Sequence, residues 1–281
     1  MSMTYDPRLT PARPDLAAKH LEGQVTAARF VAGETREIVE PMAPVRRAPS
    51  PDATLLTEGL MGERVTVYET TDEGWAWGQL DADRYVGWLP AGALAAPGPE
   101  PNRKVAALRT LVFAGPDFRL PPIMGLPFGA RLAVMRNEPL YAMTPRGFVP
   151  EQHLVPLDTV EPDFVAVAQR FLGVPYLWGG KTSLGIDCSG LVQIALAACG
   201  TACPRDSDMQ EGALGATVAP DVAALRRGDL LFWNGHVAIV HDPATLLHAT
   251  AHYMAVVTEP LAAAVERICA GGRNPMRVKR M

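Results

Sequence analysis

Two proline-rich breaks divide the chain into three segments, and this division is the strongest constraint on its fold. The first break, residues 97–102, reads Pro-Gly-Pro-Glu-Pro-Asn, and the second, residues 156–162, begins and ends with proline. Such stretches interrupt helices and sheets alike and therefore mark boundaries between folded units. With 281 residues, of which 48% are hydrophobic and 20% charged, the chain can bury one large core or two to three small ones. We expect an N-terminal extension and three domains, over residues 1–40, 41–98, 99–158 and 159–281.

The first two segments read as degenerate copies of each other. Residues 60–67 and 127–134 share a glycine two residues before an arginine, and Gly-Trp-Leu-Pro at residues 87–90 parallels Gly-Phe-Val-Pro at residues 147–150. Alternating runs such as residues 75–80, separated by Asp and Gly turns, are typical of a small antiparallel barrel. The order of an irregular loop rich in Pro and Asp, a strand, a hairpin and a closing Gly-Trp-Leu-Pro resembles bacterial SH3-like domains, and the second copy matches more loosely.

From residue 163 onward the pattern changes to mixed helix and strand. Apolar residues at helical spacing over residues 164–172 follow a Glu-Pro-Asp start signal, and a second helix is expected over Cys188–Ala198, stopped by Gly200. Strands should follow the two helices, at residues 229–233, 236–241, 246–249 and 255–258. The third segment is therefore predicted to be an α+β domain, with its helices first and an antiparallel sheet after them.

Charge and composition exclude several classes of function. The formal net charge of −4 and the scattered Lys and Arg residues provide no basic surface for a nucleic-acid backbone. No apolar run approaches the ~20 residues that a membrane helix requires. Residues 1–15 carry proline and charge where a secretory signal needs an uninterrupted apolar stretch. We expect a cytoplasmic monomer that binds neither nucleic acid nor membrane.

The cysteines are Cys188, Cys199, Cys203 and Cys269, too few for a disulfide scaffold in a chain of this length. A cytosolic location would keep them as thiols. Cys199 and Cys203 could form half of a metal site, but no second Cys or His pair with ligand spacing completes it. The alternative is that they are small buried apolar side chains near a helix end, and we expect neither a metal nor a cofactor.

Cys188 stands at the start of the second predicted helix, in the sequence Gly-Ile-Asp-Cys-Ser-Gly. A thiol attacks only as a thiolate, so a catalytic cysteine needs its pKa lowered by a helix N-terminus, a histidine partner or both. Cys188 has the first by position, Asp187 can cap the helix, and Ser189 is small enough to let a substrate backbone approach. A lone cysteine here would instead be an ordinary buried side chain, so the choice depends on partners elsewhere in the chain.

Two histidines downstream supply such partners. His236 follows Gly-Asp-Leu-Leu-Phe-Trp-Asn-Gly, and His248 lies in Leu-Leu-His-Ala. If a hairpin turns around Pro243, His236 lies roughly opposite Thr250, and His248 is its diagonal neighbour within ~8 Å. One imidazole as base and a second polar group that orients it form the triad arrangement in its cysteine version. Cys188 is therefore predicted to be the nucleophile of a cysteine peptidase.

In combination these motifs resemble the NlpC family of cell-wall peptidases. They are Tyr176 ahead of Asp-Cys-Ser-Gly, a Pro-Arg-Asp-Ser segment after the helix, Gly-Asp-Leu-Leu-Phe-Trp leading to Gly-His-Val-Ala-Ile, and a third-position histidine. The resemblance covers residues 164–258 and implies a papain-like α+β catalytic domain. It makes Cys188 the nucleophile, His236 the general base and His248 the group that orients the base. Tyr176 and the backbone N–H of Cys188 would hold the oxyanion, whereas the alternative for Tyr176 is an ordinary core tyrosine.

The resemblance also suggests substrate-binding residues beside the cleft. Asp187 is either a helix N-cap or an anion that faces a substrate ammonium, and the two are compatible. Arg205 and Ser207 match a family loop where polar groups could meet a glutamyl α-carboxylate, although a solvated turn is the alternative. Ser189, next to the nucleophile, completes this set.

Two SH3-like domains ahead of such a catalytic domain resemble the γ-D-glutamyl-L-diamino acid endopeptidases, which release L-Ala-D-Glu from recycled muropeptides. In that subgroup the first barrel closes one side of the cleft, so that only a small peptide with a free L-Ala amine fits. An ammonium in a closed pocket needs anions or ring edges around it. Glu58 and Tyr85 are the candidates in the first copy, although Glu58 could equally be an exposed loop residue. The second copy has no acidic residue at that place.

Two other functions remain open at the level of sequence. One is a wall-binding module with a vestigial peptidase domain, and the other is an amidase or acyltransferase on the same fold, because different acceptors can resolve a thioester. His248 and His252 are four residues apart, as in a helical zinc pair, but no Glu follows the first of them. The remaining histidines are expected to be structural or exposed: His20, His153, His241 and His252.

Overall fold

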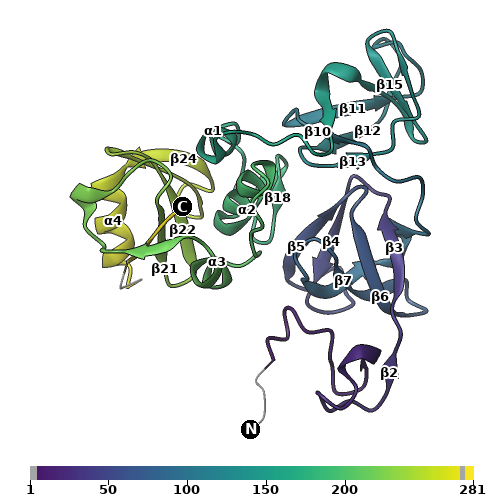
Figure 1. Cartoon of the computed structure of the whole chain (residues 1–281), viewed down its shortest axis with the longest axis horizontal. Helices are drawn as coiled ribbons and strands as arrows, with labels where there is room; N and C mark the ends of the chain where they lie inside the picture. The colour runs from purple at the N-terminus through teal and green to yellow at the C-terminus, as the bar shows by residue number, and fades with distance from the viewer. Residues whose placement is uncertain (1–4, 273–275) are drawn as a thin grey trace. The chain divides into compact units, whose positions relative to one another are not determined.

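The computed structural model describes residues 5–272 and 276–281, and the chain falls into two units, Met1–Thr159 and Val160–Met281. The first unit consists almost entirely of β-structure, and the second combines helices with a six-stranded sheet and a two-stranded pair, β18 (Lys181–Thr182) and β19 (Gly185–Ile186) (Figure 1). No helix in these residues is long and apolar enough to cross a membrane. The four cysteines are free thiols.

The first β-region is a seven-stranded antiparallel sheet that curls around its own core. Buried side chains of alternate residues fill the interior, among them Ile38, Val45, Val65 and Leu89, as the alternating sequence pattern predicts. In spatial order the strands are β5 (Leu55–Leu60), β4 (Met42–Arg46), β8 (Val86–Pro90), β7 (Trp75–Leu80), β6 (Arg64–Thr70), β3 (Glu34–Ile38) and β9 (Leu94–Ala95).

The segment expected to be an N-terminal extension is part of this region. Strand β3 pairs along its length with β6, so the predicted boundary at residue 40 cuts through the sheet. Upstream, β1 (Ala17–Ala18) and β2 (Phe30–Val31) form a short parallel pair. The Arg13 guanidinium lies over the rings of Trp77 and Trp88, at 4.4 and 4.9 Å from their centroids. The polar sequence of this N-terminal segment does not reveal the docking, because a single arginine makes much of the contact.

The second β-region contains a five-stranded and a three-stranded sheet. The five-stranded sheet has the order β12 (Pro122–Pro127), β11 (Arg109–Phe113), β16 (Gly147–Pro150), β15 (Tyr141–Thr144) and β14 (Arg136–Glu138). The three-stranded sheet has the order β13 (Arg131–Leu132), β10 (Arg103–Val105) and β17 (Leu154–Pro156).

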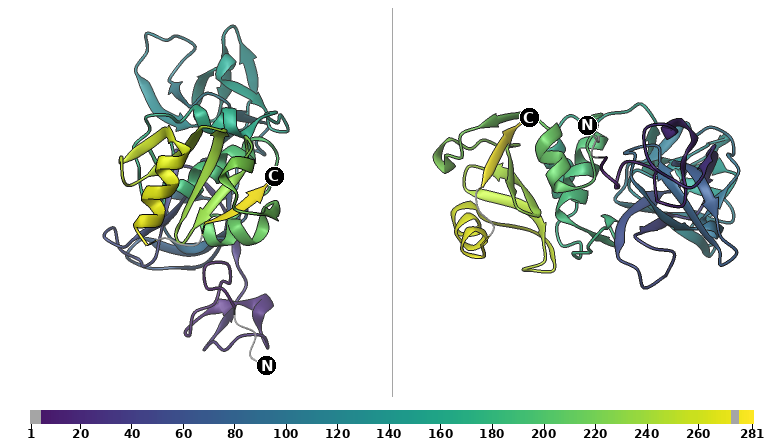
Figure 2. Two further views of the ribbon diagram at one scale, coloured as in Figure 1. Left: turned by 90° about the vertical axis from the view of Figure 1, so that its left-hand side faces the viewer. Right: turned by 90° about the horizontal axis from the view of Figure 1, so that it is seen from below.

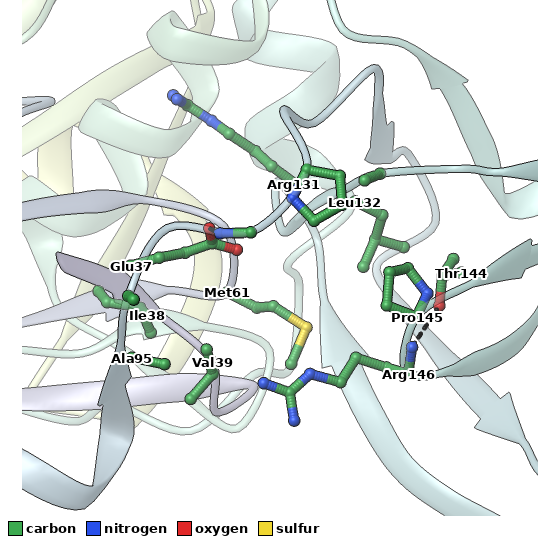
Figure 3. Close-up of a pocket in the computed structure, with 14 residues that line it drawn as sticks. Glu37, Ile38, Val39, Met61, Ala95, Arg131, Leu132, Thr144, Pro145 and Arg146 are labelled. Atoms are coloured by element: carbon green, nitrogen blue, oxygen red, sulfur yellow. Dashed lines mark hydrogen bonds between the residues drawn. The ribbon is translucent and has the colours of Figure 1, made fainter.

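Met61, in the turn between β5 and β6, joins the two β-regions. Its side chain belongs to the hydrophobic cluster of the second region, with Val105, Leu126 and Leu132. The Arg131 N–H donates to the Met61 carbonyl at 2.8 Å. Gly62 has a φ of +80°, and a side chain there would collide with the backbone of Arg131. Figure 3 shows the pocket beside this joint, with Met61 at its centre.

The second unit is built around a six-stranded antiparallel sheet. The order is β20 (Ala216–Val218), β25 (Arg277–Arg280), β21 (Leu230–Trp233), β22 (His236–Asp242), β23 (Thr245–Thr250) and β24 (Ala255–Pro260). In the part of this unit that the structure describes, four α-helices accompany it: α1 (Phe164–Gln169), α2 (Cys188–Ala198), α3 (Ser207–Ala213) and α4 (Leu261–Ala270). Figure 2, with Figure 1, shows α1 and α2 on one side of the sheet and α4 on the other.

The expected order of helices and then antiparallel sheet is present in this unit. Helix α2 has the predicted bounds, and Asp163 caps α1 by accepting from the backbone N–H groups of Val165 and Ala166. Helix α4 was not predicted. It packs its apolar side on the sheet through Leu261, Ala264 and Ile268, and thereby covers the face opposite α1 and α2.

Candidate active site

Cys188 is the first residue of α2, and its sulfur lies against the beginning of β22. The Asp187 carboxylate caps the helix by accepting from the Gly190 N–H at 2.7 Å. The backbone N–H groups of Val237 and Ser189 point at the sulfur. Val237 directly follows His236, so the thiol lies at the end of the strand that carries the predicted base.

Burial dominates the acidity of this thiol. It raises the pKa of Cys188 to about 11, and the neighbouring Asp187 carboxylate acts in the same direction. The two backbone N–H groups and the Arg205 guanidinium oppose the rise without cancelling it. The resting thiol is therefore protonated, and it needs a base beside it that can take the proton and remain there as a cation.

His236 and His248 meet as the hairpin hypothesis predicted. The Nε2 atom of His236 lies 2.9 Å from Nδ1 of His248, and the ring centroids are 5.1 Å apart. Strands β22 and β23 pair Ile239 with Leu247 and Val240 with Leu246, a register that places His236 opposite Thr250 when continued. The assumed hairpin and its register are confirmed. Both imidazoles are buried, at 6% and 1% exposure.

Two residues that the sequence analysis missed extend this pair. Nε2 of His248 lies 2.7 Å from Oε1 of Glu259, and Arg267 of α4 binds the same oxygen at 2.5 Å. Glu259 lies one residue beyond the predicted end of β24, which in the structure runs to Pro260. Had the predicted strand continued by one residue, its register would have placed Glu259 near His248. Glu259 pairs with Leu246, which lies two residues before His248 on the same face of β23.

Burial keeps the His248 imidazole neutral. Burial lowers the pKa of His248, Glu259 works against this shift, and Arg267 adds to it. Because the net direction is downward, the imidazole is uncharged at neutral pH. A neutral ring has one donor and one acceptor nitrogen, so it can orient His236 without repelling a cation that forms there.

Asp187 and Arg205 form a buried ion pair beneath the start of α2. The two nitrogens of the guanidinium bind the two carboxylate oxygens at 2.9 and 2.7 Å, and the Arg205 side chain is fully buried. The Asp187 carboxylate also accepts from the N–H groups of Gly179 and Gly190. The cap interpretation of Asp187 is confirmed, whereas a substrate ammonium would have to compete with a bidentate arginine.

Arg205 is built into this arrangement, and its contact with a substrate carboxylate stays a prediction. Its guanidinium also donates to Ser189 Oγ at 2.9 Å and to the Gly180 carbonyl at 3.2 Å, so it supports the nucleophile's loop from within. Ser189 is likewise buried, and its hydroxyl belongs to this network. Gln210, another residue that the sequence analysis missed, donates to the Ser189 carbonyl at 2.9 Å. Ser207 is half-buried at the start of α3, and its substrate contact stays a prediction.

Comparison with known proteins identifies both parts of this architecture. The sequence model of the NlpC/P60 family matches residues 173–267, which include the nucleophile, both histidines and Glu259. The model described as the bacterial dipeptidyl-peptidase SH3 domain matches residues 45–94. The chain therefore carries an NlpC/P60 domain. The expected cysteine peptidase is thereby confirmed at the level of the family, as is one SH3-like domain ahead of the NlpC/P60 domain.

Individual relatives agree with the family. A γ-D-glutamyl-L-lysine dipeptidyl-peptidase of Bacillus cereus is 25% identical over 74% of this chain and 71% of its own length. Dipeptidyl-peptidase 6 of Lysinibacillus sphaericus is 40% identical over 31% of each chain, so the match spans about a third of that relative. The crystal structure of an NlpC/P60 family protein from Bacillus cereus has the same fold, with a TM-score of 0.69, 21% identity, and coverage of 81% of this chain and 94% of that one.

The backbone of Tyr176 lies beside the segment that leads into the nucleophile. Its N–H donates to the Met254 carbonyl at 2.9 Å, and it forms an isolated parallel bridge with Ile186, two residues before the nucleophile. An oxyanion donor has to be rigid before charge develops, and these contacts fix the backbone that carries the Tyr176 ring. The oxyanion contact itself stays a prediction.

The SH3-domain candidates occupy other local environments than expected. Glu58 lies on strand β5, paired with Pro44 of β4, and is buried at 4% exposure, so the loop position predicted for it is wrong. Tyr85 is part of the hydrophobic core of the first β-region. Neither residue is without an interaction partner. Their contact with a substrate amine stays a prediction.

Other polar clusters of the described residues offer no second centre. No group of three or more His, Cys, Asp or Glu side chains in residues 5–272 and 276–281 could hold a metal ion. His153 shares a hydrogen bond of 2.7 Å with Thr110, and His241 binds Asp242 and Thr245. These histidines are therefore committed to local structure.

Proposed function

We propose that this protein is a cysteine peptidase that hydrolyses the γ-D-glutamyl-L-diamino acid bond of free muropeptides and releases L-Ala-D-Glu. The observation that carries the proposal is the arrangement of Cys188 at the helix start with His236 and its partner His248 at 2.9 Å. The names of its relatives, which include γ-D-glutamyl-L-lysine dipeptidyl-peptidases, support the choice of bond. The third-position residue is diaminopimelate or lysine.

The reaction proceeds through a thioester. His236 accepts the proton of the Cys188 thiol while the sulfur attacks the γ-carbonyl carbon of D-Glu, and Tyr176 with the Cys188 N–H holds the resulting oxyanion. The tetrahedral intermediate collapses when imidazolium His236 returns its proton to the departing amine nitrogen of the diamino acid. Water, deprotonated by His236, then attacks the thioester, and the thiol regains its proton as L-Ala-D-Glu leaves.

Selectivity for a free amine is assigned to the SH3 domain, with Glu58 and Tyr85 facing the ammonium. A buried ammonium is tolerated only beside an anion or an aromatic ring, and these residues supply one of each. The proposal includes a cytoplasmic location and a role in peptidoglycan recycling, because a free-amine tripeptide is a product of wall breakdown rather than a part of the intact wall.

The second β-region is proposed to be a divergent SH3-like copy. In both regions a glycine with positive φ, Gly62 or Gly129, lies two residues before an arginine that begins a strand. In both, a strand ends at a proline and continues through a 3₁₀ turn, Ala91–Ala93 or Glu151–His153, into a short closing strand. This shared order supports a common ancestry in which the second copy has become a scaffold.

The test compares hydrolysis of L-Ala-γ-D-Glu-diaminopimelate and of its N-acetylated form, with products identified by mass spectrometry. We expect release of L-Ala-D-Glu from the free tripeptide, little from the acetylated one, and none from either with Cys188→Ala. Equal rates on both peptides would eliminate the amine requirement. Binding to insoluble peptidoglycan without hydrolysis of any stem peptide would point to a wall-binding module, and transfer to an added amine would point to an acyltransferase.

A further inference from the structure

Beyond the two histidines, the structure shows a continuous chain of polar contacts that ends in a buried ion pair. It runs from His236 Nε2 to His248 Nδ1 at 2.9 Å, from His248 Nε2 to Glu259 Oε1 at 2.7 Å, and from Glu259 to Arg267 at 2.5 Å. We propose that Glu259 is a positioning residue that fixes the tautomers of both imidazoles, so that Nδ1 of His236 is the atom that receives the thiol proton. The inference rests on the proposed function.

The direction of each hydrogen bond follows from the far end of the chain. Glu259 is paired with Arg267, whose guanidinium is always charged, so its carboxylate is ionised and can only accept. His248 must then carry its proton on Nε2 and leave Nδ1 as an acceptor. His236 must in turn donate from Nε2, which makes its Nδ1 the unprotonated nitrogen. One carboxylate thus sets the protonation of two rings.

Three elements hold Glu259 in place. The residue is 8% exposed on β24, Arg267 reaches it from α4, and Tyr253, in the turn before β24, directs its hydroxyl at Oε2 from 3.5 Å. The Arg267 guanidinium also lies 5.8 Å from the centre of the Tyr253 ring. A carboxylate restrained from several sides keeps the imidazoles aligned without entropic cost at the moment of reaction.

The charged and titratable groups that act on His248 include its hydrogen-bond partner His236 and three further residues, Glu259, Arg267 and His252. Glu259 favours its cation, while Arg267 and the nearby His252 disfavour it, and burial disfavours it more than any of them. Removing the carboxylate would therefore make the imidazolium state less accessible. An amide in its place could either donate to or accept from His248 Nε2, so the tautomer would no longer be determined.

The first test is ¹⁵N NMR of the full-length wild-type chain with labelled histidines, assigned with His248→Gln and His236→Gln. We expect both rings to be neutral at pH 7.5, with the proton of each on Nε2. A proton on Nδ1 of either ring would overturn the proposal. Because this measurement uses no substrate, it stands whether or not the muropeptide activity is found.

The second test is Glu259→Gln, with Glu266→Gln, an exposed residue of α4, as the matched control. For Glu259→Gln we expect kcat to fall about 10- to 100-fold, as for other residues that orient a functional side chain, with KM unchanged. Loss of the negative charge disfavours the cationic form of His248 and, through their hydrogen bond, that of His236, so the acid limb of kcat/KM moves to lower pH. Glu266→Gln should leave kcat and the pH profile as in the wild type.

The double variant separates positioning from general structural damage. In a His248→Gln background, Glu259→Gln should cause no further loss of kcat, because Glu259 acts only through His248. The proposal is contradicted if the two substitutions reduce kcat multiplicatively in the double variant. It is also contradicted if Glu259→Gln lowers kcat without shifting the acid limb of kcat/KM. If the wild type fails to cleave the tripeptide at all, the proposed function has failed, and the NMR result still decides the tautomers.

Discussion

At the scale of single residues, Cys188 has the position of a nucleophile, but the pKa of its thiol is too high for a thiolate at neutral pH. Burial raises the pKa of its thiol to about 11, although the helix start and two N–H groups favour the anion. The conflict is resolved if the proton moves to His236 rather than to water, because an ion pair then forms in place of an isolated buried anion. Reactivity should therefore depend on the histidine more than on the helix.

Alkylation of Cys188 by iodoacetamide tests this dependence. In His236→Gln the thiolate must form by release of the proton to solvent, so the rate should stay low near neutral pH and rise only as pH approaches about 11. The wild type should react already near neutral pH, because His236 can take the proton. Subtracting the signal of Cys188→Ala removes the other three thiols, and His241→Gln serves as the control. Equal profiles for the wild type and His236→Gln would contradict the dependence.

At the scale of elements, the start of α2 depends on the Asp187–Arg205 pair. The pair ties the helix cap to the loop before α3, and both partners are buried. Removing one partner of such a pair leaves the other charge without compensation.

Arg205→Met should accordingly reduce the free energy of unfolding by about 3–5 kcal/mol. The matched control is Arg227→Met, which removes an ion pair with Asp163 whose side chains are 41% and 42% exposed. Exposed pairs contribute about 0–1 kcal/mol, so this variant should be nearly neutral. Urea unfolding of both variants measures the difference, and similar losses would show that burial of the pair is not decisive.

The elements also show where reasoning from sequence succeeds. Helix α2 and the β22–β23 hairpin were predictable, because local signals define them: a cap at Asp187, a stop at Gly200 and a turn around Pro243. The contacts of Arg205 and Glu259 could not be predicted, because they depend on tertiary packing. Arg205 meets Asp187 from 18 residues further along the chain. No role was assigned to Glu259, whose contact with Arg267 requires the unpredicted helix α4.

At the scale of the whole molecule, the division into Met1–Thr159 and Val160–Met281 predicts two unfolding transitions. Scanning calorimetry of the full chain should resolve both. Arg205→Met should lower only one of them, because its partners lie in the second unit. Arg13→Met should lower only the other, by about 2–4 °C, since a cation–π contact contributes about 1 kcal/mol. A single transition shifted by both variants would contradict this independence.

The docking of Arg13 has a further consequence for the SH3 domain. Its guanidinium covers the rings of Trp77 and Trp88 and is fixed there by ion pairs with Asp15 and Glu69. The two tryptophan rings are thus already occupied by a residue of the same chain. A sugar ring or an external cation could stack on them only after displacing the segment that carries Arg13. A ligand that leaves this segment in place therefore binds a different side of the first β-region. The side with the two tryptophans holds the segment around Arg13 against the sheet.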